Sequence, residues 1–568
     1  MTSNLALSPD QRRRLALPVD SPRDPIGGLR TTRARLQAWA WRHRKSLLVV
    51  TPLLVVVAAI RLWGLSHGPA LADDEGTYVA EAWAVQVKHT LAPYTYWYDH
   101  PPLGWIQVAA FTWLTGTFHS AGLHVVAVRK MMVGYAVVDA GLIYLLARRL
   151  GVRRLWAAVA VGMWALSPLA VGYSRMVYLD NIALPWVLAA FVLVATPRRS
   201  LWAHTAAGAL FAVGVLSKET MVLLLPALLW LAWQHTDRRT RSFCLVGLWS
   251  SGILVVLFYP LMAVLRGELL PGPGHVSLVQ ALQWQFLSRP STGSVLSAGS
   301  ASRTLLDQWL SLDGWLLLLG LIGGLGCLAV RRLRPIGLVV VLLVAVGLRP
   351  GYLPQPYVIT MLPFAALAAA AAADAAWTAL RDRPPVPIRR SAPREHQLRV
   401  VGRGLVLATA IALAAITIPQ WLHGDSALAS VDQTAPVVAA EHWLEAHAGA
   451  VDNRSGYGRD VLVDDTMWSD LVTHGFPQSQ VIWFYKLDYV DNLDPSVRRR
   501  IHDYRDFGYV VSSPIVRAGL SLSPAPRYEL ARQALAHATR AATFGTGPER
   551  IVIYHVVPPK PQTTRRHP

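Results

Sequence analysis

Three consecutive acidic residues, Asp73, Asp74 and Glu75, lie shortly after the first long apolar run of the chain. Acidic residues are scarce in this protein, since only 15% of all its residues are charged. A carboxylate at a membrane interface can accept a proton from a hydroxyl group and thereby act as a general base. The acidic triplet therefore predicts a site at which a hydroxyl acceptor is activated.

Further polar residues are predicted to gather on the same side of the membrane as this triplet. They stand near the ends of apolar runs or in the turns that follow: Arg129, Arg175, Asp180, Lys218, Arg349, Tyr352 and Tyr357. An ionisable group at membrane depth costs about 2.5–3.5 kcal/mol unless it is paired or hydrated. A cluster of both signs at one face therefore predicts a shared polar cavity, in which Arg and Lys hold a leaving phosphate. With an apolar groove between spans for an isoprenoid tail, these groups describe sugar transfer from a polyprenyl phosphate.

The composition is that of a membrane protein. The chain has 568 residues, of which 53% are hydrophobic, and its mean hydropathy is +0.34. Between Ser46 and Trp421 it contains apolar runs of roughly 16–24 residues, the length that crosses a bilayer. The net charge of +20 would suit a nucleic-acid-binding protein, but the arginines lie in short loops between apolar runs, where they are topology signals.

Eleven membrane spans are predicted from the apolar runs. They lie near 46–64, 124–147, 155–173, 179–196, 201–216, 220–234, 241–263, 309–330, 335–348, 357–380 and 404–422. The stretch 102–118 is a twelfth candidate.

Loop charge decides how the stretch 102–118 is placed. Four short loops, 148–154, 197–200, 234–241 and 331–335, together hold twelve Lys or Arg residues. All four fall on the cytoplasmic side, as the positive-inside rule requires, only if 102–118 does not cross the membrane. We therefore expect an interfacial helix there, a cytoplasmic N-terminus and an extracytoplasmic C-terminal segment, in the cell membrane.

The long outer segments are 65–123, 264–308 and 423–568. Residues 423–557 are predicted to form a small α/β domain after a transmembrane domain over 46–422. Strands are expected at 461–463, 481–485, 509–512 and 551–556, and helices at 439–447 and 528–543. Residues 1–45 are predicted to be a basic, disordered cytoplasmic tail, and 558–568 a second tail.

Several motifs give a resemblance to a known superfamily. Asp74 to Ala82 (DEGTYVAEA) resembles the acidic motif of the first outer loop in polyprenyl-phosphate-dependent GT-C glycosyltransferases. That superfamily includes protein O-mannosyltransferases and the aminoarabinose transferase of lipid A. His100-Pro101-Pro102-Leu103 resembles the motif that closes this loop before a surface helix. Further similar positions are Arg129, Ser174-Arg175, Leu179-Asp180-Asn181, Leu216-Ser217-Lys218 and Tyr357–Pro363, where Ile359-Thr360 replaces the usual Leu-Pro pair.

The resemblance implies a role for each matching residue. Asp74 would be the catalytic base in a single inverting displacement, with Asp73 as the alternative, and Glu75 would orient the acceptor or the base. Residues implied or expected to bind substrate are Asp73, Tyr78, His100, Arg129, Arg175, Asp180, Lys218, Arg349, Tyr352 and Tyr357. No cofactor is required, and a divalent cation on Asp74 and Glu75 stays open.

Two other functions remain open on the sequence: a lipid or sugar transporter (flippase), and a non-catalytic envelope sensor. A transporter of this kind often shows repeated halves, which the sequence does not show clearly. The expected partners are a polyprenyl-phosphate-linked sugar, membrane lipids and an acceptor that is a protein, lipid or polysaccharide, but no nucleic acid. The alanine-, arginine- and valine-rich usage favours a bacterial source and so a polyprenyl carrier.

Overall fold

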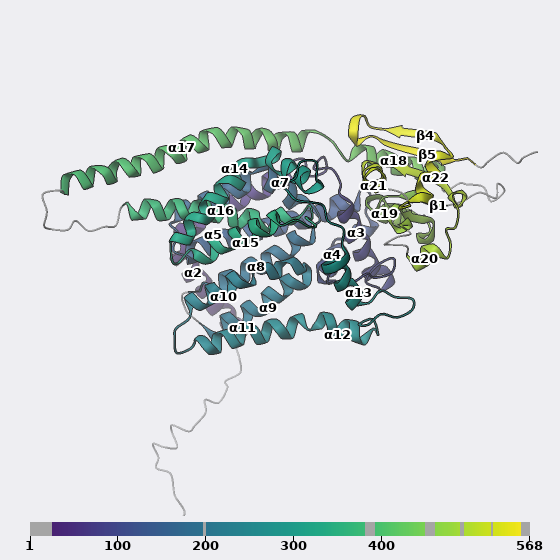
Figure 1. Ribbon diagram of the computed structural model, residues 1–568. Helices are drawn as coiled ribbons and strands as arrows, with labels where there is room; N and C mark the ends of the chain where they lie inside the picture. The colour runs from purple at the N-terminus through teal and green to yellow at the C-terminus, as the bar shows by residue number, and fades with distance from the viewer. Residues whose placement is uncertain are drawn as a thin grey trace, which may run out of the picture. The chain divides into compact units, whose positions relative to one another are not determined.

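The computed structural model describes residues 25–196, 200–380, 392–448, 460–488, 494–523 and 526–557. The chain divides into a short N-terminal unit, residues 1–52, and a second unit, residues 53–568, which contains the candidate site. The described residues are mostly helical and include one five-stranded sheet (Figure 1).

Helix α2 (Pro25–Leu62) begins earlier than the predicted first span. Residues 25–45, where disorder was expected, are helical, and residues 1–24 lie outside the described part. The stretch from Leu29 to Lys45 is rich in Leu, Ala and Arg, which are strong helix formers. Because helix propagation is easier than nucleation, a helix formed by the apolar span extends readily into such a stretch.

Every other predicted span coincides with one or more helices. These are α5 (His124–Arg149), α6 (Arg154–Leu166) with α7 (Pro168–Arg175), α8 (Leu179–Val194), α9 (Leu201–Ser217), α10 (Leu225–His235), α11 (Arg241–Val256) with α12 (Phe258–Leu265), α14 (Ala301–Ala329), α15 (Arg334–Leu348), α16 (Tyr357–Ala379) and α17 (Ala392–Ser430).

Within the described residues, six helical stretches are long and apolar enough to cross a membrane, or seven if the bent pair α6–α7 counts as one span. Helices α8, α9 and α15 are apolar but shorter. The polytopic helical class is therefore confirmed, whereas the number eleven stays a prediction.

Small residues let the apolar helices approach each other closely. A Cβ atom on Gly208 of α9 would lie 2.0 Å from the carbonyl oxygen of Leu248 on α11. On α14, a Cβ on Gly323 would lie 2.5 Å from the backbone of Ala369 on α16. In a membrane, helix association depends on such close packing because lipid chains are as apolar as the side chains they replace.

The first outer loop carries two helices, α3 (Asp73–Trp83) and α4 (Leu103–Thr115). Helix α4 occupies the stretch 102–118, and its 13 residues are too few for a span. It ends at Gly116, whose φ of 64° is the left-handed conformation that commonly terminates helices. A short helix, α13 (Leu278–Gln283), belongs to the second outer segment.

The C-terminal region contains a mixed sheet in the order β2-β1-β3-β5-β4. Its strands are β1 (Asp460–Val463), β2 (Val481–Trp483), β3 (Phe507–Ser512), β4 (Ala538–Phe544) and β5 (Ile551–Val556). Strands β1, β2 and β3 are parallel, and β5 runs antiparallel to β3 and β4. The accompanying helices are α18 (Ala435–His447), α19 (Asp465–Thr473), α20 (Pro495–Arg498), α21 (Pro514–Leu522) and α22 (Glu529–Ala536).

One predicted helix of this region is wrong in its second half. The stretch 528–543 was expected to be helical throughout, but α22 ends at Ala536 and β4 follows from Ala538. Thr539, Thr543 and Phe544 favour a strand, and pairing with β5 outweighs the helix propensity of the alanines between them. Strands lie at the four expected positions, but the one expected at 481–485 ends at Trp483, and a short 3-10 helix, Phe484–Leu487, follows it.

Candidate functional site

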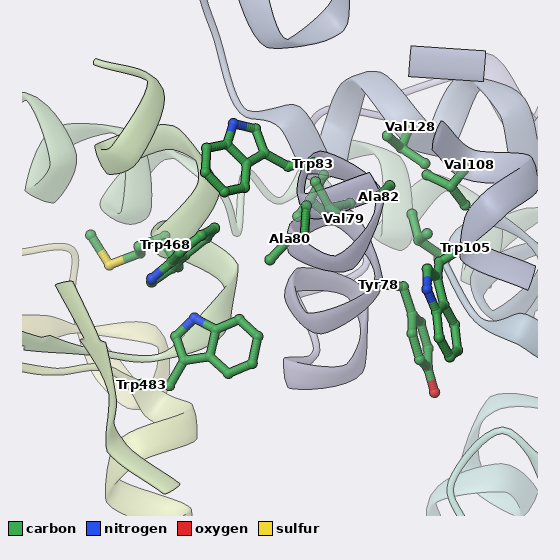
Figure 2. Packing of buried hydrophobic residues seen from close by; sticks show 14 of the residues in the cluster. Tyr78, Val79, Ala80, Ala82, Trp83, Trp105, Val108, Val128, Trp468 and Trp483 are labelled. Atoms are coloured by element: carbon green, nitrogen blue, oxygen red, sulfur yellow. The ribbon is translucent and has the colours of Figure 1, made fainter. Parts of the chain in front are cut away.

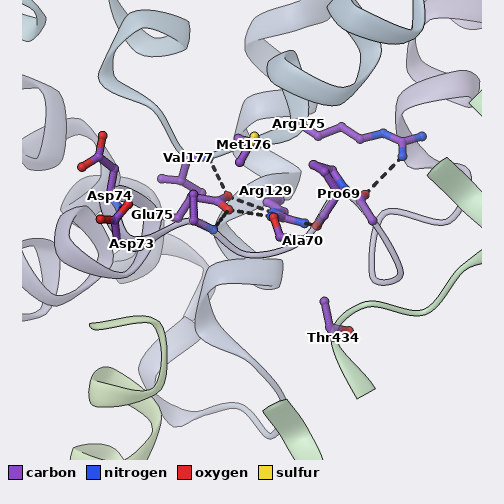
Figure 3. A network of polar contacts seen from close by, with 12 residues as sticks. Pro69, Ala70, Asp73, Asp74, Glu75, Arg129, Arg175, Met176, Val177 and Thr434 are labelled. Carbon is purple, nitrogen blue, oxygen red and sulfur yellow. Dashed lines mark hydrogen bonds and ion pairs between the residues drawn. The ribbon is translucent and has the colours of Figure 1, made fainter. Parts of the chain in front are cut away.

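The three acidic residues form the first turn of α3, but their side chains point in different directions (Figure 3). Glu75 is fully buried, and its two oxygens accept hydrogen bonds from Nε and Nη2 of Arg129 at 2.9 and 2.6 Å. The backbone N–H groups of Val177 and Ala72 donate to the same carboxylate at 2.8 and 3.1 Å. Four hydrogen bonds therefore occupy both oxygens of Glu75, and neither oxygen is left to bind the hydroxyl group of a substrate.

Arg129 is equally enclosed. Besides Glu75, its guanidinium donates to the carbonyl oxygens of Pro69 and Ala70 at 2.8 and 3.3 Å (Figure 3). The side chain is 0% exposed. The pair thus ties the start of α3 and the preceding loop to α5, so its contacts stabilise the fold.

Asp73 and Asp74 turn away from this pair (Figure 3). Asp73 is exposed, and its Oδ1 accepts the backbone N–H of Asp74 at 3.0 Å. The half-buried Asp74 carboxylate makes no hydrogen bond or ion pair with any side chain in the described part of the chain. Its negative charge acts on Lys218 and Tyr352. The charges of Asp73 and Asp74 both act on Asp465 of the C-terminal region, and that of Asp73 also acts on Tyr485.

A cluster of charged and polar side chains, His100, Lys218 and Glu219, lies within range of the charge of Asp74. Nδ1 of His100 lies 2.9 Å from the Glu219 carboxylate, and Nε2 of His100 lies 3.1 Å from Nζ of Lys218. Because a carboxylate only accepts, Nδ1 carries the proton and Nε2 accepts from the ammonium group. Burial would lower the pKa of Lys218, but the carboxylates of Glu219, Asp180 and Asp74 raise it above its usual value. Lys218 is thus a buried residue that keeps its positive charge at neutral pH.

Two further predicted residues border this cluster. Asp180, at the start of α8, is buried, and its Oδ2 finds no partner within the described residues. Tyr78 stacks on Trp105 of α4 with an interplanar angle of 6° and centroids 6.5 Å apart, and its ring lies 6.4 Å from His100. A buried carboxylate oxygen without a donor suits a hydroxyl group of a ligand.

Arg289 was missed in the sequence analysis. Its guanidinium carbon lies 3.4 Å from the ring centre of Tyr352, and its charge, like those of Asp74 and Lys218, acts on that phenol. Arg289 stands in the outer segment 264–308 rather than in a cytoplasmic loop, and this placement was the signal available in the sequence.

Three predicted substrate ligands have other surroundings. Arg175 is buried and donates to the carbonyl oxygens of Ile60, Trp63 and Gly68. The Tyr357 hydroxyl donates to the carbonyl oxygen of Leu343 at 2.6 Å. Arg349 is exposed. Of the predicted residues, the structure thus brings together Asp74, Tyr78, His100, Asp180, Lys218 and Tyr352.

The C-terminal region packs directly on α3. The Thr77 hydroxyl donates to Asp465 and lies 3.1 Å from the Tyr485 hydroxyl. A Cβ on Gly76 would lie 2.3 Å from the carbonyl carbon of Asp465, so only glycine permits this approach. In Figure 2, α3 lies between Tyr78 with Trp105 on one side and Trp468 with Trp483 on the other. These partners lie far apart in the sequence, so no local sequence pattern predicted their contact.

Among the described residues, no group of three or more His, Cys, Asp or Glu side chains is arranged to hold a metal ion.

Comparisons with known proteins can be placed beside this geometry. Residues 99–263 match the family model described as "Dolichyl-phosphate-mannose-protein mannosyltransferase". No curated protein sequence matches the chain. The fold is similar to that of ArnT from Cupriavidus metallidurans bound to undecaprenyl phosphate, with a TM-score of 0.51 and 13% identity over 91% of this chain and 98% of ArnT. The apo state of the same protein gives a TM-score of 0.50 and 14% identity over 92% and 98%.

These findings confirm the predicted fold class and the resemblance that the motifs indicated. The family model matches less than a third of the chain but includes α4, α5 and the Lys218 turn. The ArnT match extends over both the helical part and the C-terminal sheet region. The chain is therefore a multi-pass membrane protein with the GT-C fold.

Proposed function

We propose that this chain, a multi-pass membrane protein that shares its fold with ArnT, is a glycosyltransferase that takes its sugar from a polyprenyl-phosphate donor. The observation that carries the proposal is the half-buried Asp74 carboxylate, which has no hydrogen-bond partner among the described side chains and whose charge acts on the buried, charged Lys218. One group suits the acceptor proton, and the other suits the leaving phosphate.

The reaction we propose is a single displacement. Asp74 accepts the proton of an acceptor hydroxyl group while the oxygen of that hydroxyl attacks the anomeric carbon of the donor sugar. The new C–O bond forms while the bond between that carbon and the phosphate oxygen breaks, and the electron pair leaves with the polyprenyl phosphate. Lys218 and Arg289 stabilise the negative charge on the leaving phosphate, and the anomeric configuration is inverted.

The other residues of the site have supporting roles in this proposal. Asp180 accepts a hydrogen bond from a hydroxyl of the donor sugar, and His100 holds the Lys218 ammonium in position. Glu75 and Arg129 act as positioning residues, because all their hydrogen-bonding groups face the protein. We place the site on the extracytoplasmic face of the cell membrane, with the N-terminus in the cytoplasm, because only this orientation keeps the four basic loops inside.

Turnover in lipid nanodiscs tests the proposal. Purified protein receives radiolabelled polyprenyl-phosphate sugars together with an envelope extract as the source of acceptors, and released polyprenyl phosphate is measured. We expect release by the wild type and a loss of about 10²–10⁴-fold in Asp74→Asn, the usual contribution of a general base. Asp73→Asn is the matched control and should keep most of the activity.

Two results would count against this assignment. Equal release by Asp74→Asn and the wild type would remove Asp74 from the role of base. A folded wild-type protein that releases no polyprenyl phosphate from any donor would contradict the proposed reaction itself.

A further inference from the structure

A cavity of about 400 Å³ lies beside α3 on the side of the C-terminal region. Its lining includes Glu81, Trp97, Asp99, Trp483, Tyr485 and Lys486. A volume of this size is in the range of small-molecule sites. None of these residues belongs to the proposed phosphate-binding cluster.

The cavity and the proposed base share one face of the helix. Asp74, Thr77 and Glu81 are three and four residues apart, the spacing that stacks side chains along one side of a helix. Thr77 and Glu81 line the cavity, and the charge of Asp74 acts on Glu81. A molecule that fills the cavity can therefore extend towards Asp74.

Lys486 is the most unusual lining residue. It is 6% exposed, and its Nζ lies between 5.2 and 5.9 Å from the ring centres of Tyr94, Trp97, Trp483 and Tyr485. No hydrogen bond or ion pair joins its ammonium group to another described residue. Burial lowers the pKa of Lys486, and the charges of Asp494, Asp99 and Glu81 oppose this shift. A buried ammonium without an acceptor is costly, so a ligand oxygen would complete its surroundings.

Three other lining residues keep buried polar atoms without a partner in the described part of the chain. These atoms are Oε2 of Glu81, Nε1 of Trp97 and Nε1 of Trp483. Buried polar groups are normally satisfied, and exceptions call for an unseen partner. The cavity therefore offers indole and ammonium donors, a carboxyl group and several aromatic faces within one enclosure.

This combination selects a class of ligand. A purely apolar ligand would leave the polar atoms unsatisfied, and a strongly anionic one would meet Glu81 and Asp99. A neutral sugar ring has hydroxyl groups on its rim, which donate and accept, and C–H faces that lie against aromatic rings. The number and mixture of groups fit such a ring.

We infer that this cavity is an acceptor subsite that binds a neutral sugar ring, so that the acceptor of the reaction is a carbohydrate chain or a glycolipid. The inference rests on the proposed glycosyltransferase function and names the substrate class of that same site. Lys486 donates to a ring or hydroxyl oxygen, and the aromatic residues around it hold the apolar face of the sugar. The acceptor hydroxyl then reaches Asp74 along the shared face of α3.

The test measures binding without turnover. Saturation-transfer difference NMR is recorded on the protein in nanodiscs with three probes: methyl α-mannopyranoside, methyl β-galactopyranoside and methyl α-arabinofuranoside. We expect at least one of them to bind the wild type, and Lys486→Met to weaken that binding by about tenfold, the effect of losing one charge-assisted hydrogen bond. Lys88→Met, which removes an exposed lysine of the same outer loop, is the matched control.

The outcomes separate the two proposals. Asp74→Asn should still bind the glycoside although its turnover is lost. Glycoside binding by a wild-type protein that turns over no donor would keep the subsite and contradict the proposed reaction. Turnover by a wild type that binds no glycoside, or binds it equally well after Lys486→Met, would overturn the subsite and leave the reaction standing. Trp97→Leu provides a second variant should Lys486→Met fail to fold, and the same loss is expected.

Discussion

Separating the buried pair Glu75–Arg129 should destabilise the protein strongly, because both side chains are 0% exposed. Two hydrogen bonds join the charged groups at 2.9 and 2.6 Å. In Arg129→Met, Glu75 keeps only the N–H groups of Val177 and Ala72 as donors. In Glu75→Leu, the guanidinium keeps only the carbonyl oxygens of Pro69 and Ala70. Each variant buries an uncompensated charge.

The expected loss in the free energy of unfolding is about 3–5 kcal/mol for either single variant, the usual effect of breaking a buried pair. The double variant Glu75→Leu/Arg129→Met buries neither charge, so its loss should be smaller than the sum of the single losses. The difference should fall in the range of about 0.5–3 kcal/mol that coupled neighbours show. A matched exposed pair is Arg303–Asp307, where Asp307→Asn should cost about 0.5 kcal/mol or less.

The free energies are obtained from reversible unfolding in mixed micelles, and binding of a fluorescent polyprenyl phosphate is measured on the same preparations. If the pair stabilises the fold, both single variants should lose stability, and the double variant should lose less than the sum of the two. If Arg129→Met kept full stability but lost affinity for the lipid phosphate, Arg129 would be a donor ligand. That result would refute the reasoning from its enclosed hydrogen bonds.

Three other predictions concern single positions. Gly76→Ala should shift the C-terminal region off α3 and speed proteolysis of residues 460–488, because the new Cβ would meet the Asp465 backbone at 2.3 Å; Gly134→Ala, with no heavy atom within 4 Å, should be harmless. Burial raises the pKa of Glu81 well above its usual value, so folding favours its protonated form and stability should fall as the pH rises above about 4.3, the value in the unfolded chain. Glu81→Gln should not show this loss of stability. The check is the unfolding temperature of both proteins between pH 5 and 9, and an equal dependence on pH in the two proteins would contradict the prediction. Asp374→Ala should cost about 1–3 kcal/mol of unfolding free energy in a denaturant titration, since the buried carboxylate accepts from the backbone and side chain of Arg153; an unchanged midpoint would count against that role.

The membrane part was predictable because the signal is local. An apolar run of bilayer length must form a helix, since lipid offers no partner for unpaired backbone groups. The charge of the short loops then separated 102–118 from the predicted spans, and α4 there is a short helix. Strand β5, with its run of Ile, Val and Tyr, was equally clear from its residues.

The second half of the predicted helix 528–543 failed because of tertiary contacts. Strand β4 carries alanines that favour a helix, and only its pairing with β5 makes it a strand. Residue type likewise did not show how many protein groups surround each basic side chain. Arg129 and Arg175 looked equivalent to Lys218, yet each of the two has its guanidinium bonded to protein groups.

Helix α3 explains how one carboxylate remains available in so apolar a chain. Successive residues of the helix point in different directions, and each is held by a different part of the fold: Glu75 by α5, Thr77 by Asp465 and Tyr78 by Trp105 of α4. Because these contacts fix the helix from several sides, Asp74 needs no hydrogen bond of its own to hold its position. A carboxylate that is held in place by its helix, and not by its own hydrogen bonds, loses little entropy and breaks no hydrogen bond when it accepts a proton. The same contacts set the C-terminal region against the face that carries Asp74, where we propose that the acceptor enters.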